Sequence, residues 1–179
     1  MATVIEVINT ENEKLLNAIL QICSAYYADT RIPNYYADFY RLALSDPRSI
    51  ICIVREGSKI IGYILGIRHD CPAIKYVVEK DAEFNVKDFK RYYVDTLEIY
   101  KKNLSYYDFV RLIKIFVAEA TENRGIRNFS MYTRQKVTKK IMRVLLGKIK
   151  GEINLLRTIV ADWYGGTPEK YDYLEATPE

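Results

Sequence analysis

Two β-rich runs joined by a short turn constrain the fold of this chain more than any other stretch. The first run is Ile50-Ile-Cys-Ile-Val54, the second is Ile60-Ile-Gly-Tyr-Ile-Leu-Gly-Ile67, and Arg55-Glu-Gly-Ser-Lys59 connects them. β-branched and aromatic residues favour strands, and a glycine in a short connection lets the chain reverse its direction. The pattern therefore predicts an antiparallel hairpin within a sheet.

The stretch before this hairpin predicts one strand and two helices. Val4-Ile-Glu-Val-Ile8 alternates in the manner of a first strand. Thr10-Glu-Asn-Glu13 has the spacing of a capping box, in which the hydroxyl and the carboxylate each bond a free N–H group at a helix start. A helix is predicted over 12–27, and a second amphipathic helix is predicted over 34–44 before Asp46-Pro47 ends it.

The second half of the chain contains two further predicted elements before its basic region. Between Val86 and Asn103, aromatic and apolar residues recur at helical spacing, which predicts a helix. The apolar run Leu112-Ile-Lys-Ile-Phe-Val-Ala118 predicts a strand over 111–118, and a polar loop follows over 119–129.

Three elements are predicted after that loop. A helix over 131–150 has an apolar stripe, and Ile153-Asn-Leu-Leu-Arg-Thr-Ile-Val160 is typical of a strand. Gly165-Gly166 before Thr167-Pro168 indicates a turn and the start of a helix.

Composition limits the class of protein. With 179 residues, 49% of them apolar, the chain is predicted to be one globular domain spanning 1–179. Its apolar runs are too short to span a membrane and its first residues form no signal sequence, so the expected location is the cytoplasm. Three cysteines and one histidine argue against a zinc site and for buried thiols. Sixteen tyrosines with two glutamines favour a source of the thermophile type.

Positive charge is concentrated in one stretch. Residues 124–150 contain nine Lys or Arg residues and no Asp or Glu, although the net charge of the chain is only +4. A loop that leads into a basic helix offers unpaired N–H groups and the positive end of the helix dipole to an anion. This distribution fits a small phosphate-bearing ligand about as well as it fits nucleic acid.

The order of the predicted elements resembles that of the GNAT family of N-acetyltransferases. Members run from a strand through two helices and a hairpin to a strand, which leads into an acyl-CoA pyrophosphate loop, a helix and another strand. Ile51-Cys-Ile-Val-Arg-Glu-Gly-Ser-Lys-Ile-Ile-Gly-Tyr63 is similar to the hairpin of the family. The resemblance implies an α/β fold with a GNAT-like central mixed, mostly antiparallel sheet flanked by helices. It also implies a helical insertion at about 71–110, before the cofactor strand.

The resemblance implies acetyl-CoA, or another acyl-CoA, as the cofactor. Its pantetheine would lie along the strand residues Phe116, Val117 and Ala118. Its pyrophosphate would lie on the loop residues Arg124, Gly125, Ile126, Arg127, Asn128, Phe129 and Ser130.

The loop departs from the family pattern at both glycine positions. In the register Arg124-Gly-Ile-Arg127-Asn-Phe129, these positions carry Arg127 and Phe129. Glycine there lets the backbone approach a phosphate closely. Three alternatives stay open: Gly125 makes the close approach in another register, cofactor binding is altered, or it is lost.

Acyl transfer to an amine requires a base for the amine and benefits from an acid for the leaving thiolate. Glu119 and Glu122, after the predicted cofactor strand, are the candidate bases, and Tyr171 and Tyr164 are the candidate acids. The acceptor would be an amine on a small molecule or a protein, bound between the helices of 12–44 and the insertion.

Two other functions remain open at this point. One is a GNAT-like interaction module without catalysis, and the other is a nucleic-acid-binding protein that uses the basic helix 133–150 with Tyr132 as a stacking residue. A homodimer is also left open. His69-Asp70-Cys71 does not form a catalytic triad, because neighbours on a strand point to opposite faces.

Overall fold

The predicted hairpin lies within a seven-stranded sheet of the computed structural model, which describes residues 3–8, 13–26, 33–87, 90–99, 105–146, 151–163 and 167–179. Strands β2 (Ile50–Glu56) and β3 (Lys59–Arg68) pair antiparallel. At the turn between them, Gly57 has a φ of 62°, a left-handed value that glycine adopts at little cost. The predicted hairpin is therefore confirmed.

Among the described residues, the strand order is β1-β2-β3-β4-β5-β7-β6. β4 and β5 are parallel, and every other neighbouring pair is antiparallel. The bounds of the other strands are β1 Thr3–Ile8, β4 Arg91–Ile99, β5 Asn128–Arg134, β6 Gly151–Ala161 and β7 Glu169–Pro178. The sheet is mixed and mostly antiparallel, as predicted, and β1 and β6 confirm the strands predicted at 4–8 and 153–160.

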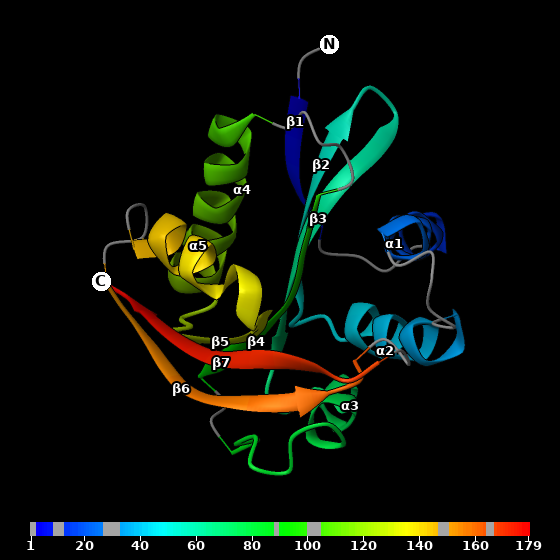
Figure 1. Ribbon diagram of the computed structural model, residues 1–179. Helices are drawn as coiled ribbons and strands as arrows, with labels where there is room; N and C mark the ends of the chain where they lie inside the picture. The colour runs from blue at the N-terminus through cyan, green and yellow to red at the C-terminus, as the bar shows by residue number, and fades with distance from the viewer. Residues whose placement is uncertain are drawn as a thin grey trace.

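Helices cover both faces of this sheet (Figure 1). Helices α1 (Glu13–Tyr26) and α2 (Pro33–Ser45) lie on one face, with the short helix α3 (Lys75–Val78) after the 3-10 turn Pro72–Ile74. Helices α4 (Tyr106–Ala118) and α5 (Gln135–Leu146) lie on the other face. The helices predicted at 12–27 and 34–44 are confirmed. No helix in the described part of the chain is long and apolar enough to cross a membrane.

The sheet separates two hydrophobic clusters, and the hairpin contributes to both. Ile51 and Ile53 pack toward α1 and α2, whereas Ile50, Cys52 and Val54 pack on the α4 side. A strand covered on both faces is apolar at every position rather than at alternate positions. This explains why the run 50–54 contains no polar residue.

The strand predicted at 111–118 is wrong, because this segment belongs to helix α4. The hydroxyl of Ser105 accepts a hydrogen bond from the N–H of Asp108 at 3.0 Å, which caps the helix. The residues that α4 buries are Leu112, Ile113 and Phe116, and helical spacing brings them to one face. The β-branched content of the run therefore indicated the wrong element.

Three further predictions are corrected by the strands of the second half. Within the helix predicted over 86–103, residues 91–99 form strand β4 instead, and Tyr92 and Tyr93 are directed to opposite cores at a period of two. The helix predicted over 131–150 starts only at Gln135, because the preceding residues form β5. The helix start predicted at Thr167-Pro168 precedes a strand, β7.

Candidate active site at the diverging strands

The central feature of the site is the short contact between the parallel strands β4 and β5. They pair over three positions only, Arg91 with Asn128, Tyr92 with Phe129, and Tyr93 with Ser130. Beyond these pairs, β4 runs to Ile99 against β3, and β5 runs to Arg134 against β7. Their facing edges are therefore not paired with each other after Tyr93 and Ser130. We call this divergence of residues 94–99 from 131–134 the splay.

A β-bulge bends β4 at the point where the splay begins. The register of β3 and β4 passes from Ile64↔Leu97 to Gly66↔Val94, so Asp95 and Thr96 lie opposite the single residue Leu65. A bulge increases local twist and redirects a side chain. The carboxylate of Asp95 is thereby placed at the start of the splay.

A pair of buried tyrosines holds this carboxylate. The hydroxyl of Tyr40, on α2, donates to Oδ2 of Asp95 at 3.1 Å and shares a 2.7 Å hydrogen bond with the hydroxyl of Tyr63, on β3. Both tyrosine side chains are fully buried, while Asp95 is half-buried. Asp95 therefore lies on the α1 and α2 face of the sheet, in a fixed orientation.

An aromatic cluster lies across the base of the splay on the same face. The ring of Tyr132, on β5, is 6.2 Å from that of Tyr93, 5.2 Å from that of Trp163 and 5.0 Å from that of Tyr173. The hydroxyl of Tyr132 donates to Asp81, and burial raises its pKa. Tyr132 thus packs against the rest of the fold on this side of the splay.

Candidate acid Tyr171 lies at the open end of the splay. It pairs in register with Arg134, the last residue of β5, and its ring is 6.1 Å from that of Trp163. The pKa of its hydroxyl is raised above the ordinary tyrosine value. Burial is the main cause, and a hydrogen bond with Arg134 opposes it in part. The second candidate acid, Tyr164, lies outside the described residues.

The two glutamates predicted as bases follow α4 in the chain and lie at the closed end of the splay. Glu119 and Glu122 belong to a π-helical turn, Glu119–Asn123, after α4, and this turn leads into the start of β5, where β4 and β5 still pair. Glu119 accepts a hydrogen bond from Arg124 at 3.3 Å, and Glu122 is exposed. They are on the α4 side of the sheet, whereas Asp95 is on the α2 side.

The residues predicted to line a cofactor strand lie on the last turn of α4. Phe116 is buried, with its ring 5.8 Å from that of Phe129, and Val117 and Ala118 follow it in the helix. Their cofactor role was predicted from a strand at 111–118. Because that segment is helical, the prediction loses its structural basis.

The loop predicted to hold pyrophosphate is a short connection with internal contacts. Gly125 has a φ of 65°, a left-handed value that favours glycine. A Cβ added at this position would have no atom within 4 Å. The glycine is therefore required by the backbone conformation and not by a close contact with another group. Arg124 donates to the carbonyl of Pro47 at 3.1 Å, and Arg127 is exposed. The other predicted loop residues contact the rest of the protein. Ile126 and Phe129 are buried. Asn128 accepts a hydrogen bond from Thr177 at 2.9 Å, and Ser130 is bonded to His69 at 2.9 Å.

The basic helix is partly neutralised by the C-terminal strand. Arg134 forms a 3.0 Å ion pair with Glu169, and Lys136 lies 4.0 Å from the same carboxylate. Lys139 and Arg143 are exposed on α5. The positive face of the described part of α5 is therefore smaller than the sequence predicts.

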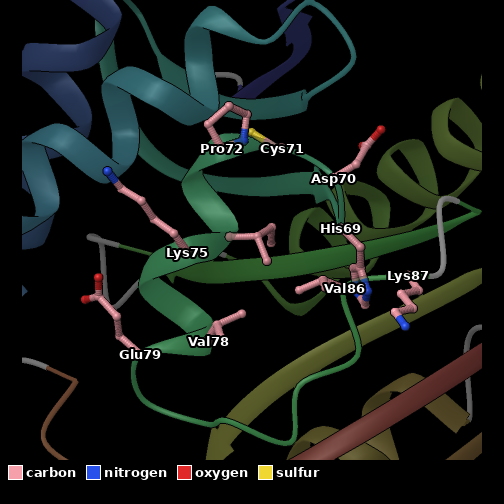
Figure 2. A pocket seen from close by; sticks show the side chains of 10 residues that line it. His69, Asp70, Cys71, Pro72, Lys75, Val78, Glu79, Val86 and Lys87 are labelled. Atoms are coloured by element: carbon pink, nitrogen blue, oxygen red, sulfur yellow. The ribbon is translucent and has the colours of Figure 1, made fainter.

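A shallow pocket of about 610 Å³ lies beside α3 (Figure 2). Of the side chains that line it, Asp70 pairs with Arg48 at 2.8 Å and with Arg68 at 3.1 Å. Both ring nitrogens of His69 are used, Nδ1 with the carbonyl of Asn85 at 2.6 Å and Nε2 with Ser130. Burial raises the pKa of the Cys71 thiol to about 11. The pocket is at the closed end of the splay, since His69 bonds the first residue of β4.

Sequence reasoning missed Asp95, Tyr40 and Tyr63. The alternation in Arg91-Tyr-Tyr-Val-Asp-Thr-Leu-Glu-Ile99 was the signal that could have revealed a strand with Asp95 on one face. Within the described residues, no group of three His, Cys, Asp or Glu side chains could hold a metal ion.

No protein-family model and no curated protein matches the chain, but solved structures do. A GNAT-family acetyltransferase from Streptococcus pneumoniae superposes with a TM-score of 0.62 at 10% identity, over 97% of this chain and 98% of that one. An aminoglycoside 6'-N-acetyltransferase complexed with coenzyme A gives 0.64 at 9% identity, over 97% and 96%. A putative acetyltransferase from Salmonella typhimurium with acetyl-CoA gives 0.63 at 8% identity, over 100% and 95%. The chain therefore has the fold of the GNAT acetyltransferases.

Proposed function

We propose that this chain is an N-acyltransferase, which transfers an acyl group, most simply acetyl, from coenzyme A to an amine at the splay. The observation that carries the proposal is the position of Asp95. Its carboxylate accepts from buried Tyr40, which is bonded in turn to buried Tyr63, and lies at a bulge where β4 leaves β5. A base at the start of such a divergence can receive a proton from an amine that enters from the α2 face.

The splay suits the pantetheine arm of an acyl-CoA. On β4, residues 94–99 use one edge to pair with β3, and their other edge faces β5 without pairing to it. An extended arm that contains amides can bond such an edge in the manner of an added strand. When bound, the cofactor supplies a thioester whose acyl carbon is open to attack by an amine. Two structures of the same fold hold coenzyme A or acetyl-CoA, which supports this assignment.

Asp95 would accept the proton that the amine must lose. An ammonium group has no lone pair, so it must first lose one proton to water. The neutral amine then attacks, and the second N–H proton, which leaves as the N–C bond forms, is the one that Asp95 accepts. The hydroxyl of Tyr40 keeps the carboxylate oriented through Oδ2, and Tyr63 in turn holds Tyr40. As the C–S bond breaks, the sulfur takes up a proton, and Tyr171 remains the candidate donor because burial keeps its hydroxyl protonated at neutral pH.

The acceptor is proposed only as an amine, on a small molecule or on a protein. Structures of the same fold include an aminoglycoside acetyltransferase and a ribosomal-protein-alanine acetyltransferase, so both kinds of acceptor are compatible with it. The acidic side chain and the aromatic rings on the α2 face favour a positively charged amine.

The Asp95→Asn variant tests this proposal. The amide keeps the size of the side chain and can still accept from Tyr40, but it cannot take a proton. We expect thiol release from acetyl-CoA, measured over a panel of amines, to fall by about 10²- to 10⁴-fold. Stabilisation of the fold by saturating acetyl-CoA, about 2.7 kcal/mol at a hundredfold excess over Kd, should remain. Asp38→Asn, at an exposed position of α2, is the matched control and should leave both properties unchanged.

Other results would favour the alternatives. Stabilisation by acetyl-CoA without turnover of any amine would support an interaction module. No response to acetyl-CoA, together with stabilisation by duplex DNA that weakens steeply with salt, would support nucleic-acid binding through α5. Full activity of Asp95→Asn would remove Asp95 from the mechanism.

A further inference from the structure

Strand β6 forms one margin of the sheet and carries exposed apolar side chains. It pairs with β7 along one edge, and no strand in the described part of the chain pairs with its other edge. Leu155, Leu156 and Val160 are 48%, 51% and 65% exposed. Seven large apolar residues are exposed in the described part of the chain, and these three of them lie within one stretch of six residues. An apolar edge strand of this length is a template for pairing with another strand.

The usual protection of an edge strand is weak in β6. Natural edges carry lysines, inward-pointing charges or prolines that oppose pairing between molecules. Gly151–Ala161 contains no lysine or proline and has two charged residues, Glu152 and Arg157. The charge of Arg157 is already neutralised, because its guanidinium donates to Asp81 and lies 4.3 Å from the ring centre of Tyr173. Repulsion between two copies of the strand is therefore small.

We propose that β6 pairs antiparallel with β6 of a second copy of this chain, about a two-fold axis at Thr158. The register of β6 on β7 supplies the reason. Leu155, Thr158 and Val160 oppose Leu174, Asp172 and Lys170, alternate residues of β7, so the three share one face. Leu156 is the extra residue of a bulge between Leu155 and Arg157.

An axis at Thr158 keeps the exposed apolar side chains on one face and places the two residues of each bulge opposite a single partner residue. It sets Val160 of one copy against Leu155 and Leu156 of the other, twice, so all six exposed apolar side chains meet. Arg157 then lies opposite Ile159, and Thr158 lies opposite itself. An axis at Arg157 would instead set Leu155 and Leu156 opposite Thr158, so Val160 would no longer meet them. An axis at Ile159 would set Leu155 and Leu156 beyond the end of the partner strand.

The mass of the protein in solution tests this pairing. Sedimentation of the wild-type chain at high micromolar concentration should give twice the chain mass of 20.9 kDa. Val160→Lys, at a largely exposed position, should fold normally and sediment as a monomer. Val86→Lys introduces the same charge at an exposed valine outside β6 and should leave the dimer intact. A monomeric wild type, or a dimer that survives Val160→Lys, would overturn the proposal.

A cysteine cross-link tests the position of the axis. Thr158→Cys should form a disulfide between two copies under mild oxidation, because the two residues face each other. Glu152→Cys is the matched control on the same strand, since its two copies would lie about 40 Å apart. Thr158 also bonds Asp172 through its hydroxyl at 2.7 Å, so circular dichroism must first show that the variant is folded. Cross-linking at 152 but not at 158, in folded protein, would place the axis elsewhere.

Discussion

Asp81 is the residue at which the segment between β3 and β4 meets the C-terminal strands. Its carboxylate is almost fully buried and accepts from the hydroxyl of Tyr132, on β5, and from the guanidinium of Arg157, on β6. A buried carboxylate is expensive unless it is paired with a charge and with hydrogen-bond donors. Asp81 therefore fixes Tyr132, and with it the aromatic cluster at the base of the splay.

Replacing Arg157 by alanine should be severely destabilising. The change leaves Asp81 buried without its guanidinium, and we expect the free energy of unfolding to fall by about 3 kcal/mol. Urea unfolding of both proteins measures the difference. Arg41→Ala breaks the exposed ion pair with Asp38 and should change stability by less than about 0.5 kcal/mol. Equal effects of the two substitutions would contradict the role of Asp81.

The thiol of Cys52 should make the fold sensitive to alkali. Burial, and to a smaller extent the charge of Glu119, raises its pKa from 9.0 to about 12. The folded chain therefore holds this proton more tightly than the unfolded chain does. The contribution to stability is complete below pH 9 and falls by about 1.4 kcal/mol per pH unit between pH 9 and 12.

Urea unfolding at pH 8, 9.5 and 10.5 (values chosen around the ordinary thiol pKa of about 9) checks this effect. Cys52→Ala should lose stability less steeply with pH than the wild type does. Val54→Ala, on the same strand and in the same core cluster, also removes buried atoms but carries no titrating group. Its pH dependence should match that of the wild type. Identical slopes for all three proteins would show that Cys52 does not titrate in this range.

At the scale of secondary structure elements, α4 depends on close contact with the sheet. A Cβ at Gly66, on β3, would lie 2.6 Å from Cζ of Phe116 and 3.0 Å from Cδ2 of Tyr92. Such distances are too short, so the helix approaches β3 only because Gly66 has no side chain. The same contact keeps Phe116 in the core and away from the splay.

Gly66→Ala should therefore be destabilising by about 1–3 kcal/mol through overpacking. Phe116→Leu removes the ring atoms that clash and should restore part of the loss when combined with Gly66→Ala. Urea unfolding of the two single variants and the double variant gives the coupling energy, which we expect to exceed about 0.5 kcal/mol in favour of the double variant. Simple additivity would mean that Phe116 moves freely to accommodate the methyl group.

The elements that sequence predicted correctly are those whose pattern is local. The hairpin 50–67 combines strand-forming residues with a turn that needs a glycine, and both signals lie within eighteen residues. In contrast, α4 was predicted as a strand and part of β4 was predicted as a helix. The β-branched residues of a buried helix and the aromatic residues of a strand are each compatible with a helical and with a strand period. The cap at Ser105 and Asp108 was the local signal that distinguishes them.

At the scale of the whole molecule, the candidate site depends on pairings between distant segments. Asp95 gains its position from a bulge against β3 and from the end of pairing with β5, and no spacing within β4 encodes the second of these. The order of elements was sufficient to predict the fold class, since topology follows from that order. It was insufficient for the site, because a misplaced strand transfers every dependent residue to the wrong face.

The seven strands form one continuous sheet, so we expect one cooperative unfolding transition. Trp163 is the sole tryptophan of the chain and lies just after β6, against Tyr132 and Tyr171. Its fluorescence reports on the C-terminal half, whereas far-ultraviolet circular dichroism reports on all elements. The two signals should change at the same denaturant concentration. An earlier change in fluorescence would mean that β6 and β7 unfold before the rest.

The short contact between β4 and β5 also has a mechanical consequence. In the described sheet, only three backbone residue pairs join the half that contains β1 to the half that contains β7. Side-chain hydrogen bonds across this seam run from Arg91 to Glu175, from His69 to Ser130, and from Asp81 to Tyr132 and Arg157. A pulling force applied to the two ends of the chain loads this seam, because the ends belong to different halves. The two halves should separate there first. Any ligand that bonds both facing strands would raise the force needed to separate them.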